Sequence, residues 1–522
     1  MNKFLKEFLK INKKILNNKN KEIKILIIDR GRYYDSLIYS ILGSIFCNKI
    51  KSNAIIIFDK KSNIYRKIFK SFGFNNFFHN IYGYSNSNFN IITKIIKNLI
   101  CLVKDLLIVK INGLDWFIKN YKIRNVPMGD LIYNTYVRYD HSYLKKKIDI
   151  KFVKILYSTI HKTSLFFEII NKNNLKYIFA SGSGYASNNG VLYRIASFKK
   201  IKIIKLDIIN GNRIGFKVVR NYFKFNSNNS FLHIKDKNFF KQSNNIKYTK
   251  LKKFIKERNS GKIKGNFSNP GDLKNANKSK ISWSKKKLIE KIFQSQEFKK
   301  KIVVIAAHAF SDAPRQEGLI IFKDYYEHLK ETLDYIENKK LKNVFWLVKP
   351  HPSSRSYKES GIVAKLLRNY KNEHIKEAPQ NLSAINTNKI CDYVVTSCGS
   401  ISLEFANSGK YPIIAGKALY SNLGFTKDHV TKNEYFKTLV KIHKMPKLNK
   451  KQILTSMKVL FGLECLTTHT ILKNSDIFDN KVFNMIKNNK NNIFSKELIE
   501  NLKKIDFIED KMVKDFLSVK IK

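Results

Sequence analysis

The sequence predicts an α/β protein with two Rossmann-type, doubly wound domains that face a cleft, followed by a helical C-terminal tail. Two observations lead to this class. Short apolar runs alternate with helical patterns in residues 22–225 and 301–450, and such alternation is typical of parallel sheets covered by helices. Between these parts, residues 226–300 are rich in Asn, Lys and Ser and have too few large apolar side chains for a core, which indicates a linker or insertion.

The first of the two parts opens with a βαβ pattern. The apolar run Glu22–Ile28 ends at Asp29, a helical pattern follows, and Ala54–Phe58 is the next expected strand. The turn after the first strand has no G-x-G-x-x-G sequence, so a dinucleotide site is not favoured. Further strands are expected at Tyr177–Ala180 and Ile201–Leu206, separated by the small-residue loop SGSGYASNNG and a helix. Such a loop either lets the backbone approach a ligand closely or serves as a simple tight connection.

The second part repeats the alternation at short spacing. We expect four strands, each followed by a polar loop or a helix: Ile302–Ala306, Asn343–Lys349, Tyr393–Thr396 and Pro412–Ala415. Residues 451–522 contain helical patterns and no strand signal. The sequence therefore predicts two parallel sheets and a helical end.

The charge of the chain is its most unusual compositional feature. Its 522 residues include 99 Lys and Arg against 40 Asp and Glu, a net charge of +59, and most of the cations are lysines spread over every segment. Proteins that read nucleic-acid sequence concentrate Arg on one element, so no specific nucleic-acid partner is expected. A basic surface favours contact with anionic lipid headgroups or acidic glycans.

The expected location is cytoplasmic, peripheral at the inner face of the cytoplasmic membrane. Residues 1–21 form a basic amphipathic pattern without the features of a signal peptide; such a helix lies on a membrane surface or is simply solvated. The later apolar stretch Ile91–Gly113 is interrupted by charged side chains and is too polar to span a bilayer. Five scattered cysteines without C-x-x-C spacing indicate reduced thiols and no zinc site.

A first group of candidate binding residues follows the strand Asn343–Lys349, in the sequence KPHPSS. Prolines fix the backbone on both sides of His351, so we expect its ring to be exposed at the strand end, beside Lys349, Pro352 and Ser353. An imidazole and a lysine at that place bind a donor phosphate or stabilise the charge of a departing nucleotide. The alternative is a histidine with a purely structural role.

A second group lies in the sequence TSCGSISLE, after the strand Tyr393–Thr396. Its hydroxyls and backbone N–H groups at an expected helix start would suit an anion, and the group consists of Ser397, Gly399, Ser400 and Ser402. Ser400 would alternatively only cap the helix. Glu404 would accept hydrogen bonds from a ribose or only complement the helix dipole.

Candidates for catalysis come from the loops after the first strand of each part. His308 and Asp312 follow Ile302–Ala306 and would contact donor or acceptor, while Arg315 on the same loop would pair with a phosphate. Asp29 ends the first strand of the chain and is a candidate general base. Spacing alone does not choose between Asp29, Asp312 and other carboxylates such as Asp35 and Asp130, and a solvated loop is the alternative for residues 308–318.

These segments together resemble a known group of proteins. HAFSDAPR, FKDYYEHLKETL, NVFWLVKPHPSS and VVTSCGSISLEFANSGKYPIIAG look like bacterial surface and capsular polysaccharide biosynthesis proteins, which are GT-B-type glycosyltransferases. GDLIYNTYVR and SGYASNNGVLYRIA look like the same group. The histidine–proline pair and serine-rich loop are also similar to those of sialyltransferases, Kdo transferases and polyglycerolphosphate transferases that use CMP- or CDP-linked donors. The resemblance covers most of residues 22–225 and 301–430.

The resemblance implies a GT-B-like fold and a glycosyltransferase that moves a sugar from a CMP-, CDP- or UDP-linked donor to a growing surface polysaccharide or lipid-linked acceptor. His351, Pro352 and the loop Ser397–Ser402 would then contact the phosphates and ribose of the donor, without a cofactor. The absence of a D-x-D sequence fits a metal-independent mechanism. Two alternatives stay open, namely a glycerol- or ribitol-phosphate transferase that uses a CDP-alditol, and a non-catalytic nucleic-acid- or membrane-binding protein with this fold.

Overall fold

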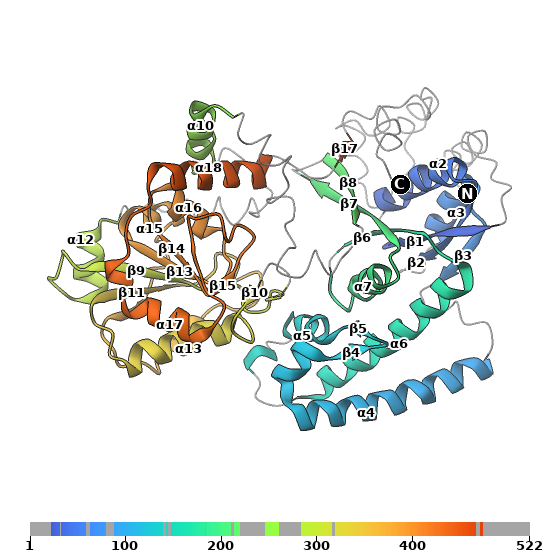
Figure 1. Ribbon diagram of the computed structural model, residues 1–522, viewed down its shortest axis with the longest axis horizontal. Coiled ribbons are helices and arrows are strands. Elements are labelled where there is room, and N and C mark those ends of the chain that lie inside the picture. The colour runs from blue at the N-terminus through green and yellow to red at the C-terminus, as the bar shows by residue number, and fades with distance from the viewer. Residues whose placement is uncertain are drawn as a thin grey trace. The chain divides into compact units, whose positions relative to one another are not determined.

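The computed structural model describes residues 22–31, 33–58, 63–79, 88–138, 142–144, 148–182, 184–209, 213–219, 246–259, 283–315, 319–465 and 470–472 (Figure 1). It divides the chain into two compact units. The first unit is formed by Met1–Ile132, Asp149–Tyr222 and Thr468–Lys522, and the second by Tyr133–Ile148 and Phe223–Thr467. The sequence had predicted continuous domains, with 133–148 in the first. The structure instead groups this segment with the second half of the chain.

The first unit contains a seven-stranded sheet in the order β17-β8-β7-β6-β1-β2-β3. Five of its strands run parallel, and β8 and β17 are antiparallel to their neighbours. The strands are β1 (Ile23–Asp29), β2 (Asn53–Phe58), β3 (Asn76–His79), β6 (Tyr177–Ser181), β7 (Lys202–Ile209), β8 (Arg213–Val219) and β17 (Thr470–Leu472). The helical pattern expected after residue 450 did not predict β17, which pairs with β8 on the edge of this sheet.

Six helices and one hairpin lie between the strands of this sheet in the sequence. They are α2 (Tyr33–Lys49), α3 (Asn63–Ser71), α4 (Asn88–Asn120), α5 (Gly129–Arg138), α6 (Ile150–Asn173), α7 (Gly190–Phe198) and the hairpin of β4 (Lys122–Ile123) with β5 (Val126–Pro127). One of them, α5, continues beyond Ile132 into the segment that belongs to the second unit. Local residues fix their ends. Asp149 caps α6 by accepting hydrogen bonds from the amides of Lys151 and Phe152, and the left-handed Asn174 (φ 46°) ends it. Gly113, with φ 79° and ψ 165°, kinks α4.

The second unit contains a six-stranded sheet in the order β12-β11-β9-β13-β14-β16, in which every neighbouring pair is parallel. The strands are β9 (Lys301–Ala306), β11 (Val344–Lys349), β12 (Ile375–Glu377), β13 (Tyr393–Thr396), β14 (Pro412–Ile414) and β16 (Lys427–Asp428). In chain order the strands lie 3-2-1-4-5-6, so the direction of winding reverses between β9 and β13. This order confirms the predicted doubly wound α/β class.

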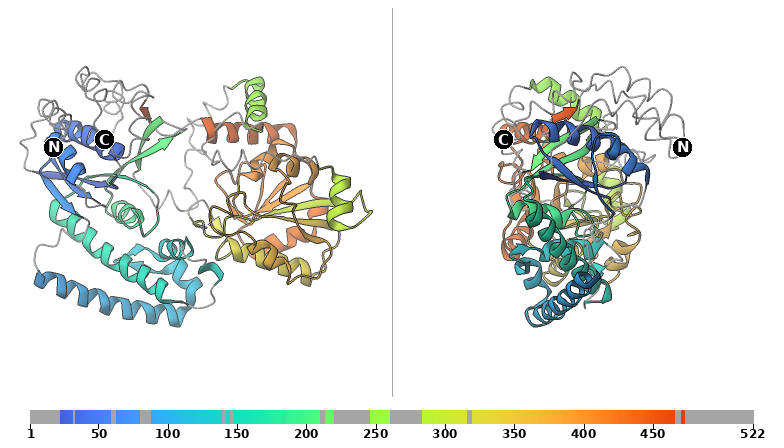
Figure 2. Two further views of the ribbon diagram at one scale, coloured as in Figure 1. Left: turned by 180° about the vertical axis from the view of Figure 1, so that it is seen from behind. Right: turned by 90° about the vertical axis from the view of Figure 1, so that its right-hand side faces the viewer.

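Helices cover both faces of this second sheet (Figures 1 and 2). The helices of this unit are α10 (Tyr248–Asn259), α12 (Lys285–Leu288), the π-helical turn η3 (Ile289–Phe293), α13 (Tyr325–Asn338), α14 (Ile362–Leu367), α15 (Ala384–Ile390), α16 (Ile401–Asn407), α17 (Lys432–Val440), η4 (Ile442–Lys444) and α18 (Lys450–Cys465). The short strands β10 (Leu319–Ile320) and β15 (Gly416–Lys417) form a separate antiparallel pair. Helix α10 lies in the Asn/Lys-rich segment, where no element was expected. Its Leu251 and Phe254 are buried in a cluster with α16 and α18. No described helix has the length and apolar character needed to cross a membrane.

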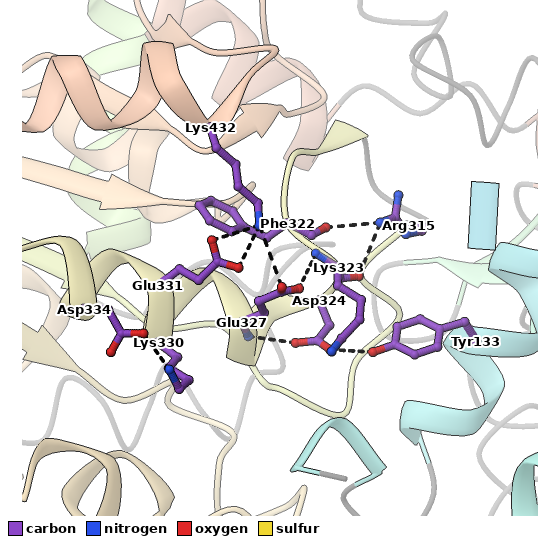
Figure 3. A network of polar contacts seen from close by, with 10 residues as sticks. All are labelled: Tyr133, Arg315, Phe322, Lys323, Asp324, Glu327, Lys330, Glu331, Asp334 and Lys432. Carbon is purple, nitrogen blue, oxygen red and sulfur yellow. Dashed lines mark hydrogen bonds and ion pairs between the residues drawn. The ribbon is translucent and has the colours of Figure 1, made fainter. Parts of the chain in front are cut away.

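A buried hydrogen bond ties the segment 133–148 to the second unit (Figure 3). The Tyr133 hydroxyl donates to Asp324 Oδ2 over 2.5 Å, and Asp324 caps α13 by accepting from the Glu327 amide. Both side chains are almost fully enclosed, and desolvation by burial raises the pKa of Asp324. The enclosed carboxyl therefore depends on the tyrosine for one of its hydrogen bonds.

We expect Tyr133→Phe to lower the free energy of unfolding by about 1–3 kcal/mol, because it leaves a buried carboxyl without this donor. Urea denaturation measures the loss. Tyr326→Phe is the matched control, since the Tyr326 hydroxyl makes no hydrogen bond to any residue that the structure describes. Equal stabilities of the two variants would contradict the assigned role of Tyr133.

Candidate active site

A pocket of about 380 Å³ opens in the second unit at the carboxyl ends of β9, β11 and β13. The strand order reverses between β9 and β13, and such a point is where open α/β sheets bind their ligands. The predicted residues that line it are His308, Asp312, Lys349, His351, Pro352, Ser353, Gly399, Ser400 and Glu404. The structure thus brings together loops that are up to about ninety residues apart in the sequence.

Three rings are stacked at the pocket, and two of them, His308 and His351, line it. The ring of His308 lies 4.0 Å from that of Tyr325 and 5.5 Å from that of His351, with interplanar angles of 18° and 19°. Burial and the neighbouring His351 lower the pKa of His308 to about 4. A histidine with this pKa is neutral at neutral pH and accepts a proton only weakly. His308 is therefore better suited to stack on the ring of His351 than to act as a general base.

The backbone after β11 sets the protonation of His351. The amide of Ser353 donates to His351 Nδ1 over 3.2 Å, and the hydroxyl of Ser354 donates to the His351 carbonyl over 2.7 Å. Because Nδ1 accepts, the neutral ring carries its proton on Nε2. The pocket wall therefore presents a hydrogen-bond donor from His351, and the ring becomes a cation if a bound anion draws a second proton.

Lys349 supplies the second cationic group. Its ammonium donates to the Leu382 carbonyl over 2.5 Å, and burial lowers its pKa to about 8. A lysine held in this way has lost part of its hydration without gaining a carboxylate partner in the contacts described. A phosphate in the pocket would restore the stability of its charged form.

The loop Ser397–Ser402 contributes to the pocket only in part. Ser397 and Ser402 are buried at 1% and 0% exposure and do not line the cavity, contrary to their predicted role in phosphate binding. Gly399 and Ser400 do line it. Tyr420 fixes the loop by donating its hydroxyl to the Gly399 carbonyl over 2.6 Å. Ser400 is the N-cap residue of α16, but its side chain makes no capping hydrogen bond there.

Glu404 is held by a residue that the sequence did not point to. Arg258 Nη1 donates to Glu404 Oε1 over 2.9 Å, and the two side chains are only 3% and 15% exposed. Arg258 comes from α10, in the segment interpreted as a linker, and it lines the pocket as well. Glu404 therefore enters the pocket as half of an ion pair rather than as an isolated acceptor for a ribose. No local motif around Arg258 predicts this contact.

Asp312 lies at the pocket rim among polar partners. Its Oδ1 accepts from the Ala313 amide over 3.0 Å, and its Oδ2 accepts from the Tyr357 hydroxyl over 3.4 Å. Arg138 Nη1 lies 3.9 Å from Oδ1, and its guanidinium lies 4.6 Å from the centre of the Tyr357 ring. About 35% of the Asp312 side chain is exposed, so its carboxylate can be reached from the pocket.

Two further predicted residues have structural contacts instead of a place in the pocket. Arg315 donates to the carbonyls of Phe322 and Lys323 over 3.1 and 3.4 Å, which holds the chain ahead of α13 (Figure 3). Asp29 lies in the first unit and is fully buried, where it accepts from the Gly31 amide and the Ser36 hydroxyl over 3.2 and 2.7 Å. Because no side of this carboxylate reaches solvent, the structure does not present Asp29 as an exposed base.

A buried carboxylate that the sequence did not single out positions the loop after β9. Glu359 accepts hydrogen bonds from the Phe310 amide (2.9 Å), the Ser311 amide (2.6 Å) and the Ser311 hydroxyl (2.5 Å). It is 2% exposed and comes from the loop that follows β11. Through this contact the loop of His308 is fixed to the loop of His351.

Within the described part of the chain, no group of three or more His, Cys, Asp or Glu side chains is arranged to hold a metal ion. The cationic and N–H-bearing residues of the pocket suit an anion instead. Lys349, His351 and the backbone of Gly399 and Ser400 converge on it.

Neither a family model nor a curated protein matches the chain. Among solved structures, it is similar to the β-Kdo 2,7 transferase of Thermosulfurimonas dismutans KpsC, with 14% identity, coverage of 56% of this chain and 80% of that chain, and a TM-score of 0.30. A glycosyltransferase from Rickettsia africae matches with 12% identity over 96% and 100% of the two chains, at a TM-score of 0.24. The UDP-GlcNAc 2-epimerase of Neisseria meningitidis matches with 11% identity over 84% and 99%, at 0.25. At these TM-scores and identities, the similarities do not assign a function to the chain.

We expect the free energy of unfolding to decrease as the pH falls from about 6.5 towards 4. In this range the unfolded chain protonates His308 while the folded pocket, with its pKa of about 4, does not. His308→Gln and His308→Phe should each reduce the slope of the unfolding free energy against pH by about 1.4 kcal/mol per pH unit. Urea denaturation at several pH values measures it. A slope equal to that of the unaltered protein in both variants would show that His308 is not held neutral.

Proposed function

We propose that the chain is a GT-B-type glycosyltransferase that moves a sugar from a nucleotide-linked donor to a growing surface polysaccharide or a lipid-linked acceptor. Its donor would bind in the pocket of the second unit. The sequence resemblance to surface polysaccharide transferases supports this reaction class, and the residues of the pocket support the place of the donor.

The observation that carries the proposal is the convergence of Lys349, His351 and the Gly399–Ser400 backbone at the reversal of a 3-2-1-4-5-6 parallel sheet. This position in an open α/β sheet suits a nucleotide, because the loops after several parallel strands surround it. A cavity of about 380 Å³ falls within the range of small-molecule sites. An ammonium and an imidazole N–H on one side of it suit a phosphate.

In the proposed reaction, an oxygen of the acceptor hydroxyl attacks the anomeric carbon of the sugar. The bond between that carbon and the phosphate oxygen breaks, and its electron pair stays on the departing nucleotide. Lys349 and His351 would stabilise that charge, which is larger in the transition state than in the bound donor. Asp312 would take the proton of the acceptor hydroxyl, since it is a predicted carboxylate that lines the pocket and about 35% of its side chain is exposed.

We expect at least one of CMP, CDP, UDP or GDP to raise the melting temperature and to bind with measurable heat. His351→Ala and Lys349→Met should each weaken that binding by about fivefold or more, because each removes a charged or polar contact worth about 1–3 kcal/mol. His443→Ala is the matched control, as His443 lies in η4 outside the pocket. A protein that none of the four nucleotides stabilises, or variants that bind like the control, would overturn the proposal.

The affinity for that nucleotide should fall as the pH rises above about 8. Phosphate binds the charged form of Lys349, and burial brings the pKa of the free lysine down to about 8, so at higher pH binding must also take up a proton. Calorimetry in buffers of different ionisation enthalpy measures this uptake. Lys349→Met should abolish it.

With a suitable acceptor, a phosphodiester rather than a glycosidic product would identify a CDP-alditol phosphotransferase.

A further inference from the structure

One face of α4 exposes a continuous row of large apolar side chains to solvent. The row recurs every three or four residues, as one face of a helix requires. It consists of Ile92, Ile96, Ile100, Val103, Leu107 and Ile111. Ile100, Val103 and Ile111 are 64%, 60% and 79% exposed. The opposite face, with Asn98, Leu102 and Val109, is buried. Figures 1 and 2 show α4 beside α6 at the edge of the first unit.

The exposed sector is broad as well as long. Ile95 and Leu99 are also exposed, at 37% and 46%, and widen it on one side. At 100° per residue the apolar side chains cover about 160° of the helix circumference, far more than the seam of a two-stranded coiled coil. From residue 88 to the kink at Gly113, the helix is about 37 Å long. A contiguous apolar surface of this size marks an interaction site.

A basic pocket lies next to this face. Its volume is about 450 Å³, and its charged lining consists of Lys94, Lys97, Lys104, Lys122 and Arg124 with one carboxylate, Asp105. Lys94 pairs with Glu168 over 2.7 Å, and Asp105 accepts from the Tyr121 hydroxyl. Lys97, Lys104 and Lys122 form no ion pair with any carboxylate among the described residues. The pocket therefore carries a surplus of positive charge that is not neutralised by its own side chains.

The backbone holds the arginine of this pocket in an unusual conformation. Arg124 and Asn125 both have positive φ, 49° and 66°, at the tip of the β4–β5 hairpin. Tight hairpins favour this geometry, but Asn or Gly usually supplies it, and an arginine there carries a conformational cost. The Arg124 guanidinium donates to Ser164 Oγ over 3.3 Å and lies 5.5 Å from the Phe167 ring. The hairpin thus holds a guanidinium at the pocket.

We propose that α4 lies in the plane of an anionic phospholipid surface, with its apolar face at the acyl boundary and headgroup phosphates in the basic pocket. An in-plane helix combines a wide apolar sector with Lys and Arg beside it, which is the arrangement of α4. Five lysines and two aspartates on α4 exclude a spanning orientation. This inference does not rest on the proposed donor site, which lies in the other unit.

A second copy of the chain fits the same face less well. Lys110 lies within the exposed apolar sector, where a dry helix–helix seam would have to bury its ammonium. On a lipid surface the same lysine extends its charged end to the headgroups while its methylenes stay in the apolar layer. The basic pocket would also have no anionic counterpart in a copy that carries a net charge of +59.

Flotation of the full-length protein with phospholipid vesicles tests the proposal. We expect binding to phosphatidylcholine vesicles that contain about a third phosphatidylglycerol, and at least tenfold weaker binding to pure phosphatidylcholine. The variant Ile100→Ser/Val103→Ser/Leu107→Ser should lose at least tenfold of the anionic-vesicle affinity although its charge is unchanged. Val430→Ser, which removes an exposed apolar side chain in the second unit, is the control. Lys97→Ala/Lys104→Ala/Arg124→Ala should bind more weakly and with a smaller dependence on salt.

The outcomes separate the possible occupants of this face. Unchanged vesicle binding by the triple serine variant would overturn the proposal, because general attraction of a cationic protein would then explain flotation. Unchanged vesicle binding together with conversion of a dimer to a monomer, measured by light scattering, would identify a second copy as the occupant. Nucleotide binding by the same variant reports on the donor site separately and should equal that of the unaltered protein.

Discussion

The arrangement of the candidate active site depends on one buried carboxylate, Glu359. Its two oxygens accept three hydrogen bonds from Phe310 and Ser311, so the loop after β9 is fastened to the loop after β11. A carboxylate at 2% exposure is tolerated only when such donors replace water. Since His308 and His351 sit on these two loops, their stacking follows from this contact. The two loops of the pocket wall are therefore held together by Glu359, which does not itself line the pocket.

The same enclosure adjusts the electrostatics of the pocket. Burial lowers the pKa of Lys349 to about 8 and that of His308 to about 4, so the free protein holds polar groups that have lost hydration. Such groups cost stability until an anion arrives. An anion then gains from each donor more than it would gain from a hydrated surface lysine. One effect thus accounts both for the expected loss of stability in acid and for the expected preference for a phosphate.

The sequence predicted the fold and the strand ends well, because they depend on local patterns. Apolar runs mark the strands, and polar residues mark the loops that meet at one edge of a parallel sheet. It did not tell which hydroxyl of TSCGSIS points inwards. Ser397 continues the buried end of β13 and Ser402 lies on the buried side of α16, while Ser400 between them lines the pocket. Which way each of them points depends on the backbone path through the turn.

Long-range contacts account for most of what the sequence could not give. Arg258 and Glu404 are 146 residues apart, and no local pattern marks either as a partner of the other. β17 pairs with β8 across an even longer separation, and three residues carry too little signal to be recognised as a strand. The segment 133–148 was expected in the first domain because of its place in the chain. The Tyr133–Asp324 hydrogen bond, formed across 191 residues, ties it to the second unit.

The two units show how little a shared topology decides about chemistry. Setting β17 aside, both sheets have the strand order 3-2-1-4-5-6. In both, polar residues follow the strand that comes first in the chain, which is β1 or β9. In the first unit, Asp29 forms hydrogen bonds within its own loop, because it accepts from the Gly31 amide and the Ser36 hydroxyl. In the second unit, the equivalent loop is held by Glu359 from another segment, so its His308 and Asp312 remain at a cavity. Whether such a loop is purely structural or forms part of a candidate site therefore depends on which side chain accepts the hydrogen bonds of its amides. The shared fold does not determine that side chain.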